Sequence, residues 1–317
     1  IMEAIILVGG LGTRLRPLTK TIPKPLLPLA NVPMVERMIR NLPEKIDSVI
    51  LAVSYGLKEM LEHFKKTNVG RKIIIVPEEN PLGTGGAMKN CEQYLTGTTA
   101  VFNGDVVSSI DLEKMIEYHQ SMKAKGTLAL WEVDNPNRFG VVKFVNGEIL
   151  EFQEKPPKGE EVSNFINAGT YILEPEIINM IPANRKISIE RDIYPKIVGN
   201  GLYGMPFEGY FIDAGTPQSY LEANFKLLEP NKESENKKIK DNVQIHKDSK
   251  IIDSIIGPNV IIGPNTIIEK CVISESVILA DSKIYGATIN TSIIGPDISL
   301  NQDTENALIS PEGEKVF

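Results

Sequence analysis

The sequence predicts an α/β fold in which a mostly parallel sheet, covered by helices on both faces, is followed by a short left-handed parallel β-helix. Three observations lead to this prediction. Apolar strand patterns alternate with amphipathic helical patterns early in the chain, closely spaced strands follow from Thr127, and a six-residue apolar repeat begins at Gly257. A chain of 317 residues is long enough for one large α/β domain and a smaller one.

The first part of the chain alternates between strand and helix patterns. Buried strands are expected at residues 4–8, 49–53, 73–76 and 100–102, and helices at residues 33–42, 57–66 and 111–125. From Thr127 the expected strands are closely spaced, at residues 127–133, 139–145, 148–154 and 166–173. This change of pattern predicts a mixed sheet that carries part of a substrate site.

A last helix is expected to close the first domain. Thr216 is a good N-cap and Pro217 suits the first helical position, so the helix should run from there to about Glu229. Residues 230–241 are polar and charged, as is typical of a linker. The expected domains are therefore residues 1–229 and residues 242–317.

The tail repeats with a period of six. From Gly257 it contains GPNVII, GPNTII, EKCVIS, ESVILA and DSKIYG, so that equivalent positions are held by Val260, Thr266, Val272, Ile278 and Ile284. Such hexads predict a three-sided β-helix with branched apolar side chains pointing inward, whereas five of them in a row argue against isolated isoleucine-rich hairpins. The open edge of a short β-helix needs a cap, which predicts a homo-oligomer formed through the tail.

Composition excludes several classes of protein. The formal net charge of −7 argues against bulk binding of nucleic acid, which requires a basic face. No apolar run reaches the roughly 18 residues that span a bilayer. We therefore expect a cytoplasmic location and no membrane partner. Cys91 and Cys271 suggest neither a disulfide framework nor a metal site, and the three histidines form no spaced cluster.

A glycine-rich turn follows the first strand and predicts a phosphate-binding loop. The order is Gly9-Gly10-Leu11-Gly12-Thr13-Arg14-Leu15, and Lys24 lies ten residues beyond Arg14. Glycines let backbone N–H groups approach phosphate oxygens, while Arg14 and Lys24 supply two cations of different geometry. The spacing fits neither a Walker loop nor a dinucleotide fingerprint. We expect this loop to hold a nucleoside triphosphate.

Two aspartates follow apolar strands, where α/β proteins bind ligands. Asp105 comes after Ala100-Val101-Phe102 through Asn103-Gly104, and Asp213 comes after Tyr210-Phe211-Ile212. One or two carboxylates together with substrate phosphates form a typical Mg²⁺ site. A lone aspartate at a strand end is more often a turn former or a helix cap, so these residues alone do not decide between the two roles.

The motifs together resemble those of the sugar-nucleotide pyrophosphorylases, a nucleotidyltransferase family, over both the first domain and the tail. The glycine loop with Lys24-Pro25, the two aspartate motifs and Glu154-Lys155-Pro156 all match. The resemblance implies a Rossmann-like mixed-sheet catalytic domain followed by the β-helix. It implies that the nucleotide is bound by Gly9, Gly10, Gly12, Thr13, Arg14, Lys24, Glu78 and Gly83. It implies that the sugar 1-phosphate is bound by Gly140, Glu154, Lys155 and Asn167, and that Mg²⁺ is bound by Asp105 and Asp213.

The implied reaction is attack of a sugar 1-phosphate oxygen on the α-phosphorus, with pyrophosphate leaving. The nucleophile is already anionic, so catalysis requires positioning and charge neutralisation rather than a general base. The expected catalytic residues are Arg14, Lys24, Asp105, Lys155 and Asp213.

Glu78 favours guanine, because a carboxylate can accept two hydrogen bonds from the N1–H and N2–H edge of that base. Glu78 could equally be a surface acid that shapes its loop. Residues 188–195 and 209–213 also resemble the mannose-1-phosphate guanylyltransferases, which implies GDP-mannose synthesis from GTP and mannose 1-phosphate. Phe211 and Gly85-Gly86 depart from the common pattern, so a glucose-1-phosphate thymidylyl- or uridylyltransferase is the alternative.

Two other classes of function compete with this interpretation. A regulatory subunit that only senses nucleotide-sugars would have lost charged site residues, but all five expected catalytic residues are present. An acyltransferase would need a histidine within the β-helical coils, and His246 precedes the regular hexads. We therefore expect the tail to serve assembly or regulation.

Overall fold

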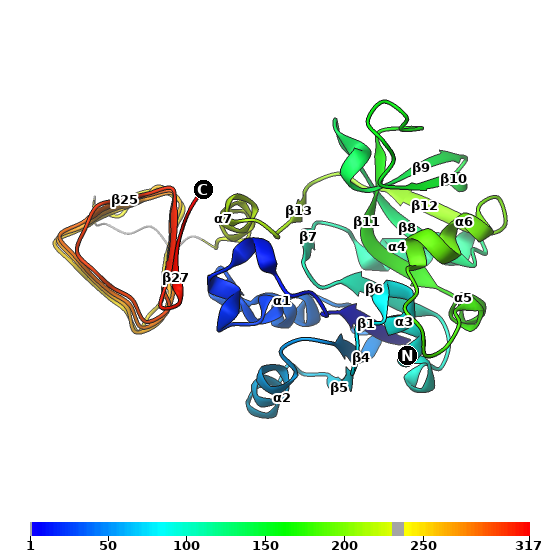
Figure 1. Ribbon diagram of the computed structural model, residues 1–317, viewed down its shortest axis with the longest axis horizontal. Coiled ribbons are helices and arrows are strands. Elements are labelled where there is room, and N and C mark those ends of the chain that lie inside the picture. Colours follow the sequence, from blue (N-terminus) through cyan, green and yellow to red (C-terminus); the bar gives the residue numbers. More distant parts are fainter. Residues whose placement is uncertain (1, 230–237) are drawn as a thin grey trace. The chain divides into compact units, whose positions relative to one another are not determined.

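The computed structural model describes residues 2–229 and 238–317 (Figure 1). By contacts between Cα atoms the chain divides into two compact units. The first unit contains the residues up to Gly10 and Met38–Phe211, and the second contains Leu11–Arg37 and Ile212–Phe317. Residues 230–237 of the expected linker lie outside the described residues, and the domain boundaries expected from the sequence stay a prediction.

In the part of the chain that the structure describes, the first unit is built on a nine-stranded mixed sheet with the order β5-β4-β1-β6-β11-β8-β12-β10-β9. The strands β5, β4, β1 and β6 are parallel, and β11 runs antiparallel to both β6 and β8. The strand bounds are β1 Met2–Leu7, β4 Ile46–Val53, β5 Lys72–Pro77, β6 Thr99–Asn103, β8 Gly126–Glu132, β9 Gly140–Val145, β10 Glu148–Glu154, β11 Phe165–Leu173 and β12 Leu202–Pro206. The parallel half and the mixed half therefore join in one sheet.

The helices expected at residues 33–42 and 111–125 are shorter in the structure, and the helix expected at residues 57–66 has those bounds. Their bounds are α1 Met34–Arg40, α2 Leu57–Lys66, α3 Gly83–Asn90, α4 Leu112–Ser121, α5 Pro175–Met180, α6 Tyr194–Ile197 and α7 Pro217–Lys226. Asp111 caps α4 by accepting a hydrogen bond from the Lys114 amide at 3.1 Å. The helix α3 was not expected, because three of its first four residues are glycine, which has low helix propensity.

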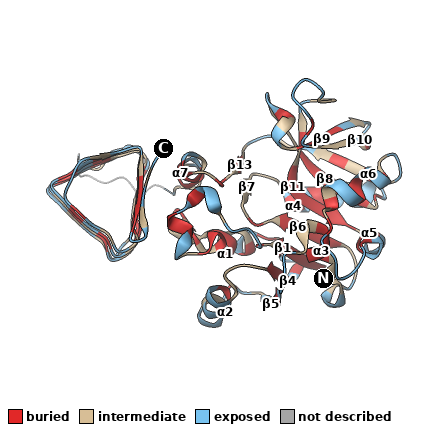
Figure 2. Cartoon of the chain, viewed as in Figure 1, coloured by how far each residue is buried: buried red, intermediate tan, exposed pale blue. Residues whose placement is uncertain are grey.

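The core of the first unit lies between the sheet and its helices, where the strands are buried (Figure 2). Ile5, Val101 and Leu130 are 0% exposed, and so are the two tyrosines Tyr171 and Tyr194. The rings of these tyrosines meet edge to face with centroids 5.4 Å apart. The continuous apolar runs that predicted buried strands thus do form the centre of the sheet.

The helix α7 begins as expected and ends early. The Thr216 hydroxyl accepts a hydrogen bond from the Ser219 amide at 3.2 Å, and the Ser219 hydroxyl accepts one from the Thr216 amide at 2.9 Å. This reciprocal capping box fixes the start of the helix. The expected end at Glu229 is wrong, because the helix ends at Lys226 and the Leu228 amide then bonds only three residues back, to Phe225.

Within residues 238–317 the strands form a parallel β-helix, which Figure 1 shows end-on as a stack of triangular coils. The first side contains β14 Val243–Ile245, β17 Val260–Ile262, β20 Ser276–Ile278, β23 Ile293–Ile294 and β26 Ala307–Ser310. The second side contains β15 Lys250–Ile252, β18 Ile267–Glu269, β21 Lys283–Tyr285 and β24 Ser299–Leu300. The third side contains β16 Ile255–Ile256, β19 Val272–Ser274, β22 Thr288–Asn290 and β25 Thr304–Glu305.

The expected strict period of six is wrong in its register. Val260 pairs with Val243 on one neighbouring coil and with Ser276 on the other, so successive coils differ in length and fall short of three full hexads. Val272 is consequently 45% exposed, and its neighbour Ile273 points inward at 0% exposed. The coils shorten from 17 residues between Val243 and Val260 to 15 between Ile293 and Leu308, which a repeat read from the letters alone does not reveal.

The β-helix satisfies its corners with short polar side chains. Residues such as Asn259, Asn265, Asp281 and Asp297 adopt positive φ, which asparagine and aspartate tolerate better than other non-glycine residues. Buried serine hydroxyls link adjacent coils: Ser276 donates to the Ser274 carbonyl at 2.7 Å and accepts from the Ser292 amide at 3.0 Å.

The end of the chain turns back on the β-helix. Strand β27, Gly313–Val316, pairs antiparallel with β26 and so covers the edge of the first side. Part of the open edge that motivated the expectation of an oligomer is therefore covered by the chain itself. None of the helices in residues 2–229 and 238–317 is long and apolar enough to cross a membrane.

Candidate active site

The glycine-rich turn starts at the end of β1. The Ser54 hydroxyl donates a hydrogen bond to the Gly9 carbonyl at 2.6 Å, and a Cβ on Gly9 would lie only 2.7 Å from that hydroxyl. Gly10 is exposed and has open space where a Cβ would stand. The backbone of these two residues is therefore held from one side and accessible from the other.

The turn continues in the second unit at Gly12, where only glycine fits well. Gly12 has a φ of 64°, and its Cβ would lie 2.9 Å from the Thr19 methyl and 3.2 Å from the Lys24 Cβ. The Thr19 hydroxyl donates to the Gly12 carbonyl at 2.6 Å. Lys24 is 7% exposed. The fold therefore packs the buried stem of Lys24 directly beneath the glycine turn.

Arg14 lies against the second aspartate motif. Its guanidinium Nη2 occupies the space that a Cβ on Gly215 would need, and that same point is 3.3 Å from the Asp213 Oδ1. Arg14 itself is exposed, in a short 3₁₀ turn over Thr13–Leu15. The second unit thus brings together Arg14 and Asp213, which are about two hundred residues apart in the sequence, and the small Gly215 makes this approach possible.

Asp105 follows β6 in the first unit through a tightly packed glycine. The Gly104 amide donates to the Leu7 carbonyl at 2.9 Å, and a Cβ on Gly104 would lie 2.7 Å from that oxygen. This contact ties the end of β6 to the end of β1 and leaves Asp105 half-buried at the carboxyl end of the parallel strands. Among the residues that the structure describes, no three His, Cys, Asp or Glu side chains form a ready-made metal cluster.

Three of the expected sugar-site residues meet on neighbouring strands. A Cβ on Gly140 would lie 2.9 Å from the Glu154 Oε2 and 3.4 Å from the Asn167 Cβ. The Asn167 amide group donates to the Tyr171 hydroxyl at 2.8 Å and accepts from the Gly169 amide at 3.0 Å. Because Gly140 has no side chain, the Glu154 carboxylate and the Cβ of Asn167 border one open space.

Lys155 ends this group on the turn after β10. It is exposed and adopts a φ of 49°, which is unusual for lysine, while its amide donates to the Phe139 carbonyl at 3.0 Å. The backbone of Lys155 is therefore tied to Phe139, the residue that precedes β9.

Glu190 joins this group, and it was not among the residues expected from the sequence. Its Oε2 accepts hydrogen bonds from the Thr84 hydroxyl at 2.6 Å and from the Ser188 hydroxyl at 3.0 Å. Burial raises the pKa of Glu154, and the negative charge of Glu190 raises it further. The signal was available in Ser188-Ile189-Glu190, but nothing in those letters predicts that this loop meets Glu154.

Glu78 lies in the segment of the first unit that connects β5 to α3. Glu78 is half-buried, and one carboxylate oxygen accepts a hydrogen bond from the Leu82 amide at 3.3 Å. Burial raises the pKa of Glu78, and this backbone hydrogen bond partly offsets the rise. Gly83 has a φ of 71° and would carry a Cβ only 2.6 Å from the Ile187 carbonyl. Glu78 therefore shapes the turn into α3, whatever else it binds.

Two histidines have structural partners. His119 is 2% exposed and lies between the Thr127 hydroxyl and the Glu174 carboxylate, each at 2.8 Å. The His246 Nδ1 accepts a hydrogen bond from the Asp248 amide at 3.2 Å and so stabilises a local turn. Both contacts lie within the fold of their own unit.

Comparison with known proteins identifies the family. A family profile described as nucleotidyl transferase matches residues 3–230, which is more than half of the chain. The chain belongs to the nucleotidyl transferase family. A second profile, described as the GMPPB C-terminal domain, matches residues 239–316. The family resemblance read from the motifs is thereby confirmed.

Three relatives of this nucleotidyl transferase are informative. Mannose-1-phosphate guanylyltransferase of Mycobacterium tuberculosis is 38% identical over 237 residues, which cover 72% of this chain and 65% of that protein. HddC from Yersinia pseudotuberculosis, solved in complex with GMP-PN, is 33% identical with a TM-score of 0.60 and covers 71% of this chain and 98% of that one. A putative glucose-1-phosphate thymidylyltransferase from Bacillus anthracis is 26% identical with a TM-score of 0.66, over 74% and 98% of the two chains.

Proposed function

We propose that the protein makes GDP-mannose and pyrophosphate from GTP and mannose 1-phosphate. The observation that carries the proposal is the contact of the Arg14 guanidinium with Gly215 beside Asp213, because it joins the glycine loop to the second aspartate motif. A relative that is 38% identical bears the name of this activity, which supports the same conclusion.

The proposed roles follow from the charges. Arg14 stabilises the negative charge that develops on the leaving pyrophosphate, and Lys24 screens the α-phosphate. Lys155 offsets the repulsion between the two phosphate groups as the sugar phosphate approaches. The attacking oxygen is already anionic, so no side chain is needed to remove a proton.

Asp105 and Asp213 are proposed to hold Mg²⁺. The donor set fits this ion, because Mg²⁺ is usually held by one or two carboxylates, with phosphate oxygens and water supplying the other ligands. Such an ion neutralises phosphate charge when it is bound. Substrate phosphates and water would supply the remaining ligands of the ion.

Guanine is the proposed base. A carboxylate at Glu78 can accept hydrogen bonds from guanine N1–H and N2–H, and its raised pKa reflects a half-buried position that a base could cover. HddC, a similar structure, was solved with the guanine nucleotide analogue GMP-PN. Because a putative glucose-1-phosphate thymidylyltransferase from Bacillus anthracis has a similar structure, dTTP and glucose 1-phosphate are the alternative substrates.

Glu154 and Asn167 are the proposed contacts to the sugar. The Glu154 Oε2 and the Asn167 Cβ border the space that Gly140 leaves open. Sugar hydroxyls can both donate to a carboxylate and accept from an amide. Glu190 supports this site through Thr84 and Ser188, because it fixes the loop that lies against Glu154.

Assembly of copies through the β-helix also remains a proposal.

The test is pyrophosphate release with Mg²⁺ for GTP, dTTP, UTP, ATP and CTP, each with mannose 1-phosphate and with glucose 1-phosphate. We expect release with GTP and mannose 1-phosphate and little in the other wells. A preference for dTTP or UTP with glucose 1-phosphate would leave Glu78 with only its structural role. No release from folded protein in any well would favour a nucleotide-sugar-sensing subunit.

A further inference from the structure

The last strand of the chain reaches the glycine loop. In β27, Gly313 and Lys315 lie on one face and Glu314 and Val316 on the other, because side chains alternate along a strand. A Cβ on Gly313 would be 3.9 Å from the ring of Pro17, whereas Val316 on the opposite face is 80% exposed. The face with Lys315 is therefore the one turned toward the loop.

Lys315 donates a hydrogen bond from its Nζ to the backbone carbonyl of Arg14 at 2.8 Å. In the 3₁₀ turn that contains Arg14, the Leu15 amide donates to Gly12 and the Arg16 amide donates to Thr13. The next donor in this series would be residue 17, which is proline and has no N–H. The ammonium of Lys315 thus supplies a donor that the turn cannot provide for itself.

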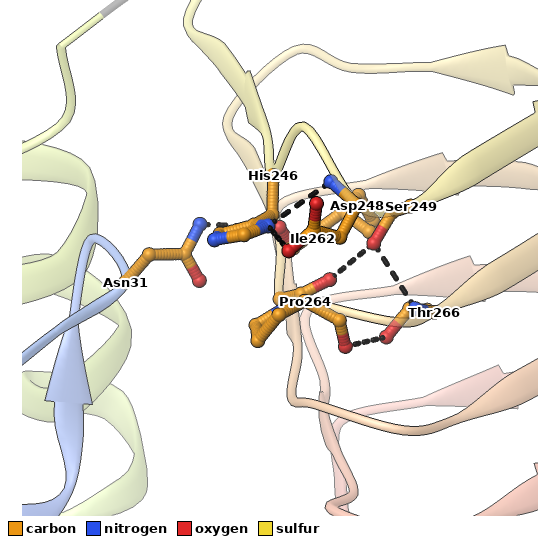
Figure 3. A network of polar contacts seen from close by, with 8 residues as sticks. Asn31, His246, Asp248, Ser249, Ile262, Pro264 and Thr266 are labelled. Carbon is orange, nitrogen blue, oxygen red and sulfur yellow. Dashed lines mark hydrogen bonds and ion pairs between the residues drawn. The ribbon is translucent and has the colours of Figure 1, made fainter.

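The segment of residues 11–37, which contains the turn of Arg14, is also held near its carboxyl end. Figure 3 shows Asn31 reaching from the β2–β3 hairpin, Pro28–Leu29 and Val32–Pro33, to the β-helix, where its amide donates to the Ile262 carbonyl at 3.1 Å. The Ala30 amide donates to Asn224 of α7 at 2.9 Å in a buried contact. Residues 11–37 are therefore attached at both ends to elements that come more than 180 residues later in the sequence.

We propose that Lys315 is a positioning residue for Arg14, so that the tip of the β-helix helps to set the rate of nucleotidyl transfer. The contact fixes the backbone from which the Arg14 guanidinium extends to Gly215 and Asp213. The β-helix then contributes directly to the site. This inference rests on the role proposed above for Arg14.

The experiment compares Lys315→Met, Lys315→Arg and Lys283→Met in the full chain. Lys283 is an exposed lysine of β21 and serves as the matched control. A net hydrogen bond of this kind corresponds to roughly a three- to tenfold change in an equilibrium or a rate. We expect Lys315→Met to lower kcat with GTP by about that factor, with the KM for mannose 1-phosphate changed by less than about twofold. Lys315→Arg should recover most of kcat, because a guanidinium can donate to the same carbonyl.

Amide hydrogen exchange over residues 12–18 gives a second measurement that does not depend on activity. Faster exchange in Lys315→Met than in Lys283→Met, at an unchanged melting temperature, would support the contact as a restraint on the loop. Equal exchange and equal kcat in these two variants would overturn the proposal, as would a Lys315→Arg variant as slow as Lys315→Met. If the wild-type protein released no pyrophosphate at all, the proposed function would fail, while the exchange comparison would still test Lys315.

Discussion

The nine-stranded sheet and the β-helix are both rich in strands, but they use their buried positions differently. Beside its apolar centre, the sheet carries half-buried polar side chains and close glycine contacts, such as Glu154 and Asn167 around Gly140. The β-helix fills its interior with branched apolar residues, among them Ile273, Ile284 and Ile289 at 0–1% exposed, and its buried serines serve to link the coils. Single changes at these half-buried polar positions of the sheet should therefore alter activity more than stability, and the reverse should hold inside the β-helix.

The glycine loop belongs partly to each of the two compact units. Residues 11–37 follow the first strand of the sheet, but their contacts place them in the compact unit that contains the β-helix. Arg14 therefore shares a unit with Asp213 and Lys315 rather than with Glu154. A change at Arg14 is the strongest way to test whether activity can be lost without loss of stability in that unit.

The largest effect is expected for Arg14→Ala. Arginines that stabilise charge in phosphoryl transfer are worth on the order of 10³-fold or more in rate, so kcat should fall by about that factor. Arg14 is exposed, and its removal should leave the melting temperature nearly unchanged. Steady-state kinetics of pyrophosphate release and a thermal melt of the same sample measure both quantities.

Two further variants calibrate that result. Lys20→Ala removes an exposed cation six residues away and should keep the wild-type rate. Gly215→Ala keeps Arg14 but forces its guanidinium away from Asp213, so we expect a loss of about ten- to a hundredfold, between the two extremes. An Arg14→Ala variant that retained most of its activity would show that the cation required for the reaction lies elsewhere.

An intermediate effect is expected for Ile289→Ala in the β-helix. Ile289 is fully buried, so truncation leaves a cavity and should cost about 3 kcal/mol of unfolding free energy. The matched variant Val272→Ala changes a side chain that is 45% exposed and should cost less than about 0.5 kcal/mol. Chemical denaturation of the two variants measures the difference.

The same pair also tests the register of the coils. In a strict hexad Val272 is equivalent to Val260 and Ile284, which are buried, whereas the folded coils bury Ile273 instead. Similar losses for Ile289→Ala and Val272→Ala would support the strict hexads and contradict the observed coils. Activity of Ile289→Ala at a temperature where it is fully folded should stay close to wild type.

Much of this architecture could be predicted because it depends on local patterns. The strand from 148 to 154 was expected and observed with the same bounds, and the cap at Thr216 followed from its residue type and the proline after it. The position of Asp105 after a buried strand also followed from local sequence.

The parts that escaped prediction depend on contacts between distant residues. The role of Glu190 arises from its meeting with Thr84 and Glu154, and the role of Lys315 from its meeting with Arg14. The helix α3 forms despite its glycines because the amides of Gly85 and Gly86 bond to the Ile187 carbonyl, at 2.9 and 3.2 Å. Tertiary hydrogen bonds thus override the low local propensity.

The smallest effect is expected for Glu154→Gln in the sheet. This substitution should raise the stability of the protein, whereas Ile289→Ala in the β-helix should lower it. Burial and then Glu190 raise the pKa of Glu154 above 4.5, so the ionised carboxylate costs the folded protein stability. Glutamine removes that cost, so the variant should melt at a slightly higher temperature than the wild type near pH 8.

The pH dependence identifies the cause of this gain. The folded state binds the proton more tightly than the unfolded state, so the gain should be full above the raised pKa of Glu154 and should vanish as the pH falls toward 4.5. Glu151→Gln, an exposed change on the same strand, should show no such dependence. A Glu154→Gln variant less stable than wild type near pH 8 would mean that the carboxylate stabilises the fold. A gain in stability with a loss of mannose 1-phosphate binding would show that the sheet keeps a half-buried carboxylate for function at the expense of stability.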